Sequence, residues 1–84
     1  MIQSAAEESS YVNLAEGQVE IEVDFLYAKT SADYEFSAYI QNTVDAAPIY
    51  IGVVLSARST TGFTAKLSAA PDSANYVLRW HVKV

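Results

Sequence analysis

The sequence contains no cysteine, one histidine, three glycines and two prolines among its 84 residues. Without cysteine the chain can form neither a disulfide framework nor a thiol nucleophile. A single histidine without cysteine is a poor ligand set for zinc. No apolar run approaches the roughly 18 residues that a membrane-spanning helix needs. The first residues also lack the basic and apolar regions of a secretory signal. We therefore expect no disulfide, structural metal, membrane partner or signal peptide.

The chain is long enough for one domain, and a domain of this size is marginally stable on its own. Hydrophobic residues make up 51% of the sequence, which is far too many for a disordered chain. Small domains usually gain stability from disulfides, a metal or partner subunits. Because the first two are disfavoured here, the composition predicts a homo-oligomer.

Basic residues are few and unevenly placed. Ten acidic residues face five lysines and arginines, giving a net charge of −5. Residues 1–45 carry −8 and residues 46–84 carry +3. This balance argues against nucleic-acid binding, which needs a basic surface. The asymmetry indicates that one half faces the other, within the chain or between subunits. Alternatively, the acidic groups only keep the surface soluble.

Residues 1–17 lack a clear period and form a separate N-terminal arm in our interpretation, while residues 18–84 form the domain. Ser4 to Glu7 has the spacing of a helix capping box, which allows a short helix from about Ala5. Tyr11, Val12 and Leu14 instead allow an edge strand or a docked arm. A frayed terminus with no role is the remaining alternative.

From residue 18 onward apolar and polar residues alternate with a period of two, which predicts strands rather than helices. Five strands are expected near residues 19–25, 34–43, 49–58, 63–68 and 75–84, with a polar turn at 29–33. The third has two apolar faces, so it should be central or covered by a partner. The pattern is typical of a small antiparallel all-β sandwich or barrel of about five to six strands. The residues expected to face inward are Val19, Ile21, Val23, Phe25, Phe63, Ala65, Leu67, Tyr76, Leu78, Trp80, Val82 and Val84. In the second strand one face holds Tyr34, Phe36, Ala38 and Ile40, and in the third one face holds Ile49, Ile51, Val53 and Leu55.

Two runs of like charge occupy the outward positions of the first and last of these strands. They are Glu20, Glu22 and Asp24, and Arg79, His81 and Lys83. Like charges at this spacing repel one another unless an opposite charge lies nearby. Direct pairing of the two strands would supply it, and so would a subunit contact. We treat these six residues as candidate interface residues; two solvated faces are the alternative.

No residue set supplies catalytic chemistry. His81 is a poor general base because Arg79 and Lys83 disfavour its cationic form. The sequence has no nucleophile elbow and no phosphate-binding glycine loop. The carboxylates of Glu20, Glu22 and Asp24 point in parallel along one strand face, which does not suit calcium. We therefore expect no enzyme and no cofactor.

Tyrosines are the remaining binding candidates. Tyr39 and Tyr50, with Tyr27, fall at positions that allow either a sugar-stacking platform or a buried interface. Tyrosine suits an interface because its ring buries area and its hydroxyl finds a partner. Tyr39 and Tyr50 therefore join the candidate interface residues.

Three segments resemble the H-type lectin domain family: Ala47-Pro48-Ile49-Tyr50-Ile51, residues 61–67 (Thr-Gly-Phe-Thr-Ala-Lys-Leu) and residues 76–82, which carry Trp80. Residues 56–64 and 67–76 are also similar to small bacteriophage virion proteins. The lectin resemblance implies a small antiparallel β-sandwich that forms trimers or hexamers. It also implies a galactose-type sugar site, for which Arg58 is the candidate residue because it lies near the family's arginine.

These resemblances lead to a functional expectation. The phage resemblance implies a virion structural protein, such as a capsid decoration, head fibre or tail accessory protein. Such a protein is made in the host cytoplasm and contacts other virion proteins. The alternative is a carbohydrate-binding module that recognises glycans on the host surface.

Overall fold

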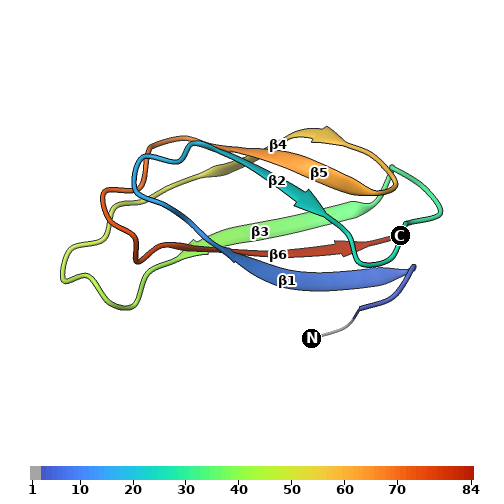
Figure 1. Cartoon of the computed structure of the whole chain (residues 1–84), viewed down its shortest axis with the longest axis horizontal. Coiled ribbons are helices and arrows are strands. Elements are labelled where there is room, and N and C mark those ends of the chain that lie inside the picture. Colours follow the sequence, from blue (N-terminus) through green and yellow to red (C-terminus); the bar gives the residue numbers. More distant parts are fainter. Residues whose placement is uncertain (1–2) are drawn as a thin grey trace.

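The chain folds into two three-stranded antiparallel sheets that lie one above the other (Figure 1). This computed structural model describes residues 3–84. The strands are β1 (Glu7–Asn13), β2 (Glu20–Asp24), β3 (Glu35–Gln41), β4 (Val53–Arg58), β5 (Gly62–Leu67) and β6 (Val77–Lys83). Sheet A has the order β1-β6-β3, and sheet B has the order β2-β5-β4. The predicted small all-β sandwich is confirmed. Within residues 3–84 no helix is long and apolar enough to cross a membrane.

The alternating pattern correctly predicts which faces of β2, β5 and β6 are buried. Ile21 and Val23 are buried in β2, while the acidic residues between them are exposed. In β6 the buried positions are Leu78, Trp80 and Val82. Their side chains and those of β5 fill the space between the sheets, because every second residue of a strand points to the same face. The core consists of Leu14, Ile21, Val23, Tyr34, Phe63, Ala65, Leu67, Tyr76, Leu78, Trp80 and Val82.

Aromatic rings form one end of this core. Trp80 lies 5.3 Å from Phe63 and 5.8 Å from Phe25, measured between ring centroids. Phe63 also makes an edge-on contact with Phe36 at 4.9 Å. Edge-on aromatic pairs stabilise a core beyond the area they bury. These contacts join β3, β5 and β6, so the two sheets are connected through aromatic packing.

The N-terminal arm contributes a strand. Residues Glu7–Asn13 pair with β6 along its whole length, from Glu7 opposite Lys83 to Asn13 opposite Val77. The alternative of a short helix from about Ala5 is wrong, because the chain forms β1 from Glu7 onward. Ser4 does accept the backbone N–H of Glu7, as a capping residue would, but the chain turns back there, with Ser4 N donating to Glu7 O. Pairing with β6 satisfies the backbone that a helix would otherwise have to satisfy.

The third predicted strand differs most from expectation. It begins at Val53 rather than at residue 49, and β4 is an edge of sheet B. Of the two alternatives, a central strand is wrong, and coverage by a partner stays a prediction. Ile49 is partly exposed and Tyr50 is fully exposed. Val19 and Val84 were expected inside, yet each is about half exposed just beyond a strand end. The alternating pattern therefore gave the wrong burial for residues that lie just outside the strands.

Candidate binding surfaces

The outer face of sheet A is built from matched rows of three residues, because β1 and β3 pair with β6 in the same register. From one end to the other these rows are Glu7–Lys83–Glu35, Ser9–His81–Ser37, Tyr11–Arg79–Tyr39 and Asn13–Val77–Gln41. Directly opposite residues have Cβ atoms about 4.5–5.5 Å apart, so each β6 residue lies beside its partner in β1 and its partner in β3. Each candidate residue of β6 therefore has a fixed pair of neighbours.

The basic residues of β6 have polar or acidic neighbours within their own sheet. Lys83 lies between Glu7 and Glu35 in the register. His81 Nε2 and Glu7 Oε2 are 2.7 Å apart. Arg79 donates from Nε to Gln41 Oε1 at 2.8 Å. β1 and β3 thus supply the neighbours of these basic residues, and the acidic strand supplies none of them.

Arg79 and two tyrosines form the central row of this face, which we call the tyrosine–arginine row (Tyr11, Arg79 and Tyr39). The Arg79 guanidinium carbon lies 5.5 Å from the centre of the Tyr11 ring, within the range of a cation–π contact. Tyr11 and Tyr39 are each about half exposed. The row therefore presents two aromatic rings beside a fixed guanidinium, and this is the combination that dominates binding energy in many interfaces.

The acidic strand lies on the opposite side of the molecule. Glu20, Glu22 and Asp24 occupy β2, which pairs with β5 in sheet B, so direct pairing of the acidic and basic strands is wrong. Glu20 is opposite Lys66 in the register. All three carboxylates are exposed on the outside of sheet B. The two charged runs therefore occupy different surfaces.

Arg58 borders a shallow pocket of about 210 Å³ at the end of sheet B. The pocket is lined by residues that include Glu22, Asp24, Arg58, Thr61, Gly62 and Thr64. Arg58 also donates to Asp33 at 3.1 Å, in an ion pair that is largely exposed. The pocket brings carboxylates, hydroxyls and a guanidinium to one place, and these groups can all hydrogen-bond a sugar.

Tyr50 lies apart from both charged faces. It contributes to the wall of a second cavity, of about 290 Å³, together with Ile40, Asn42, Pro48, Ile49, Ile51 and Tyr76. The Tyr50 side chain is fully exposed. The structure therefore divides the candidate residues among separate surfaces: Arg79, His81, Lys83 and Tyr39 lie together, while Tyr50 does not join them.

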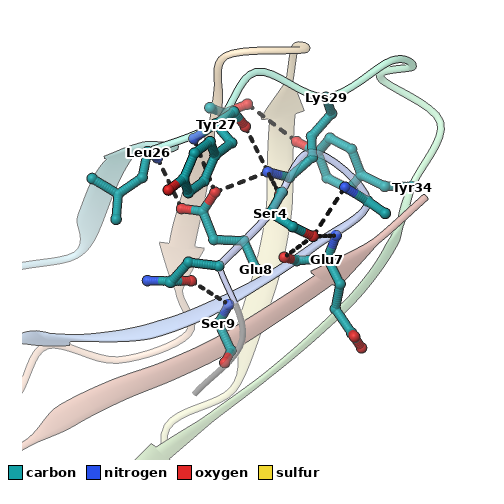
Figure 2. Close-up of polar contacts among 11 residues, drawn as sticks. Ser4, Glu7, Glu8, Ser9, Leu26, Tyr27, Lys29 and Tyr34 are labelled. Carbon is teal, nitrogen blue, oxygen red and sulfur yellow. Dashed lines mark hydrogen bonds and ion pairs between the residues drawn. The ribbon is translucent and has the colours of Figure 1, made fainter.

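A buried ion pair was missed by sequence reasoning (Figure 2). Lys29, expected in a polar turn, is buried, and its Nζ donates to Glu8 Oε1 at 2.8 Å. It also donates to the backbone oxygens of Ser4 and Tyr27 and lies 4.5 Å from the centre of the Phe25 ring. All three ammonium donors are thus used. The only available sequence signal was the inward position of Glu8 in a period-two reading of β1.

The Glu8 carboxylate, like the Lys29 ammonium, is hydrogen-bonded to several groups of the protein. Its carboxylate accepts the backbone N–H groups of Leu26 and Tyr27. Burial raises the pKa of Glu8, but the hydrogen bonds from Lys29, Leu26 and Tyr27 outweigh it and hold the pKa below its ordinary value. Because both side chains are buried and hydrogen-bonded inside the protein, this pair joins β1 to the connection between β2 and β3.

A second polar cluster joins two connections at the other end of the sandwich. Asp45 accepts hydrogen bonds from Asn42, Ser73 and Asn75. The bonds from Ser73, Asn42 and Asn75 lower the pKa of Asp45. They tie the β3–β4 connection to the β5–β6 connection. Within residues 3–84 no three histidine, aspartate or glutamate side chains gather in a way that could hold a metal ion.

Comparison with known proteins does not identify the chain. No family model matches it. No curated protein and no solved structure matches it either. The resemblances to H-type lectins and to phage virion proteins therefore stay predictions from the sequence.

Proposed function

We propose that this protein is a non-enzymatic structural component of a bacteriophage virion, where it attaches to the capsid or tail as a decoration, head-fibre or accessory protein. In this proposal it is a homo-oligomer, either a trimer or a hexamer of two trimers. The similarity of residues 56–64 and 67–76 to phage virion proteins supports the virion role. The observation that carries the binding role is the tyrosine–arginine row on the outer face of sheet A.

This row has the properties of an attachment surface. Its tyrosines are half exposed and their rings can bury a large area with little loss of side-chain entropy. Arg79 is already held by Gln41, so its guanidinium loses little further freedom on binding. The neighbouring Glu7–Lys83–Glu35 row supplies a charged rim. The partner in this proposal is another protein of the particle, with an apolar or aromatic patch that covers the two rings.

The test is sedimentation of the purified protein with particles from the phage that encodes this chain. We expect saturable binding that falls by about thirtyfold or more in Arg79→Ala and Tyr39→Ala, the size of a hot-spot loss. Lys66→Ala, an exposed change on the other sheet, is the control and should bind like the unmodified protein. A protein that never associates with particles would contradict the proposed function.

A carbohydrate-binding module is the second candidate, and the Arg58 pocket is the observation that favours it. Glu22, Asp24 and Arg58 line this pocket with two threonine hydroxyls. Carboxylates and guanidinium groups are typical polar contacts to sugar hydroxyls. A glycan array tests this candidate. Signals that disappear in Arg58→Ala but persist in Lys66→Ala support a lectin, whereas an array without signals leaves the structural role alone.

A further inference from the structure

The cavity beside Tyr50 lies where two connections meet at one end of the sandwich. Its volume is about 290 Å³, and its wall combines the β3–β4 connection with Ile40 of β3 and Tyr76 of the β5–β6 connection. Figure 1 shows both connections at the left end of the molecule, and the hydrogen bond from Ser73 to Asp45 joins them. The cavity shares no lining residue with the Arg58 pocket and includes no residue of the tyrosine–arginine row. It is therefore a separate candidate site.

The wall of this cavity is mostly apolar, and an aromatic ring stands beside it. The apolar side chains are Ile40, Pro48, Ile49 and Ile51. Tyr50 is fully exposed, but the backbone is held on both sides of it. Ile49 N donates to the Tyr76 hydroxyl at 2.8 Å, and Gly52 N donates to Ser68 Oγ at 2.7 Å. The cavity therefore suits the apolar part of a ligand and presents a ring at its edge.

Two carboxylates next to this wall accept hydrogen bonds from neutral groups. Asp72 accepts from the Tyr76 hydroxyl at 2.8 Å. Asp45 accepts from one serine and two asparagines, one of which is Asn42 of the cavity wall. These three bonds lower the pKa of Asp45, so its side chain is charged at neutral pH. Within residues 3–84 neither carboxylate forms an ion pair. Their negative charge is therefore not compensated by a cation of the chain.

This charge selects the class of ligand. Among the described residues, no lysine, arginine or histidine lines the cavity. An anion would be repelled by Asp45 and Asp72, whereas a cation would be attracted by both carboxylates and by the face of the Tyr50 ring. The apolar wall in turn requires an apolar stem. The ligand that fits is an organic cation that carries its charge at the end of an alkyl chain.

The acceptors beside the cavity favour lysine over arginine. A guanidinium carries five N–H donors in a fixed plane and needs several aligned acceptors when it is buried. Here the Asn42 amide oxygen already accepts the backbone N–H groups of residues 44 and 45, and Asp72 Oδ1 accepts from Tyr76. A lysine needs fewer acceptors, because its four-carbon stem packs against apolar groups while its compact ammonium stays at the rim, partly in water.

We propose that this cavity receives a lysine side chain of a partner protein, with the stem against the apolar wall and the ammonium toward Tyr76 and Asp72. The occupant is a protein side chain rather than a free amine, because exposed apolar groups surround the cavity. Besides Tyr50, these are Val44, which is 71% exposed, and Ile49, which is 40% exposed. Apolar and aromatic groups around a central anchor are typical of protein interfaces. The proposal does not depend on the virion role, which uses the outer face of sheet A.

NMR titration of the isotope-labelled protein with n-butylammonium chloride at constant ionic strength tests the site. This probe carries the four carbons and the ammonium of a lysine side chain. We expect saturable shifts of the Ile49 and Ile51 methyl groups and of Tyr50, with a dissociation constant in the millimolar range because the probe has few atoms. n-Butanol and ammonium chloride each lack one part of the probe, so each should bind more weakly by about threefold or more.

Two variants and a matched control locate the binding. Asp72→Asn removes a charge but keeps an oxygen that can accept from Tyr76, and Tyr50→Ala removes the exposed ring. Each should raise the dissociation constant for n-butylammonium by about threefold or more. Glu22→Gln makes the same change of charge on the outside of sheet B and should leave the constant unchanged. Amide spectra that stay the same outside the two connections would show that each variant is folded.

An acetylated and amidated leucine–lysine–leucine peptide tests whether the occupant belongs to a protein. It should bind about tenfold or more tightly than n-butylammonium, because its leucines contact the exposed apolar rim. A peptide that binds no more tightly would overturn the partner protein. An arginine peptide that binds equally well would overturn the choice of lysine, and a norleucine peptide that does so would overturn the cation. Shifts that spread over the acidic residues of β2, or no shifts at Ile49 and Ile51, would overturn the site itself.

Discussion

The Lys29 ammonium and the Glu8 carboxylate form a buried ion pair at 2.8 Å, with both side chains almost fully removed from solvent. Two residues 21 positions apart thereby join β1 to the connection between β2 and β3. Breaking one partner leaves an uncompensated buried charge, whereas replacing both with apolar groups does not.

We expect Lys29→Met and Glu8→Gln each to lower the free energy of unfolding by about 3–5 kcal/mol, measured by urea denaturation followed by circular dichroism. The double variant Glu8→Leu with Lys29→Met should lose clearly less than the sum of the two single changes. The matched control is the exposed pair of Arg58 and Asp33, whose side chains are 42% and 88% exposed. Asp33→Asn should change the stability by no more than about 1 kcal/mol. Equal losses from the exposed and buried pairs would contradict this account.

Acid should destabilise the protein through the carboxylates of Glu8 and Asp45. The pKa of each lies below its ordinary value, Glu8 through Lys29 and two backbone N–H groups despite its burial, Asp45 through three side-chain donors. A group whose pKa is lower in the folded state contributes stability above its unfolded pKa and loses it as the pH falls through the folded pKa. We expect a constant urea midpoint from neutral pH to about pH 5, then a steady fall. Glu8→Gln should make this fall shallower; an unchanged slope would mean that Glu8 does not contribute to it.

The alternation of β2 and β6 was enough to predict an antiparallel all-β sandwich or barrel and to place Ile21, Trp80 and Val82 inside. Periodicity could not reveal that Lys29 is buried, because its charged partner Glu8 comes from the N-terminal arm, 21 residues earlier, where no clear period was found. It also could not show that β4 is an edge, since apolar residues on both faces suit a central strand and a strand covered by a partner equally well.

The candidate surfaces were predictable in part. Arg79, Tyr39 and Tyr50 were all named from the sequence as candidate interface residues. Their grouping depends on strand order and register, which local pattern does not specify. Tyr11 lies beside Arg79 only because β1, at the start of the chain, pairs with β6 at its end. Tyr50 lies apart because it precedes β4, which belongs to the other sheet.

Trp80 should be the most sensitive core position. It is 5% exposed and contacts Phe25 and Phe63. We expect Trp80→Ala to cost about 3–5 kcal/mol of unfolding free energy, measured by thermal and urea denaturation. Trp80→Phe should cost much less, because it keeps a ring in the cluster and removes an indole N–H that has no hydrogen-bond partner within residues 3–84. Similar losses in both variants would show that the indole is held by something other than ring packing.

Two of the six tyrosines, Tyr34 and Tyr76, should ionise at a higher pH than an exposed tyrosine. Burial raises the pKa of Tyr34 and of Tyr76, and nearby Asp72 raises that of Tyr76 further. A group whose pKa is higher in the folded state contributes stability below its unfolded pKa and loses it as the pH rises through the folded pKa. We expect stability to decline above about pH 10. Absorbance titration of tyrosinate should show that Tyr34→Phe and Tyr76→Phe each remove absorbance change from the alkaline end of the curve.

Gly62 should tolerate no side chain, because its Cα faces the neighbouring strand β2. A Cβ built there would collide with the backbone oxygen of Val23 and come within 3.3 Å of Asp24 Cα. Backbone atoms paired in a sheet cannot move aside without opening the ladder between β2 and β5. Gly62→Ala should therefore lower the urea midpoint strongly. Gly52→Ala is the matched control, since its Cβ would meet only the Ser68 side chain, at 3.3 Å. If the two variants were equally stable, the close approach of β2 and β5 at Gly62 would be wrong, and with it the shape of the Arg58 pocket that this glycine lines.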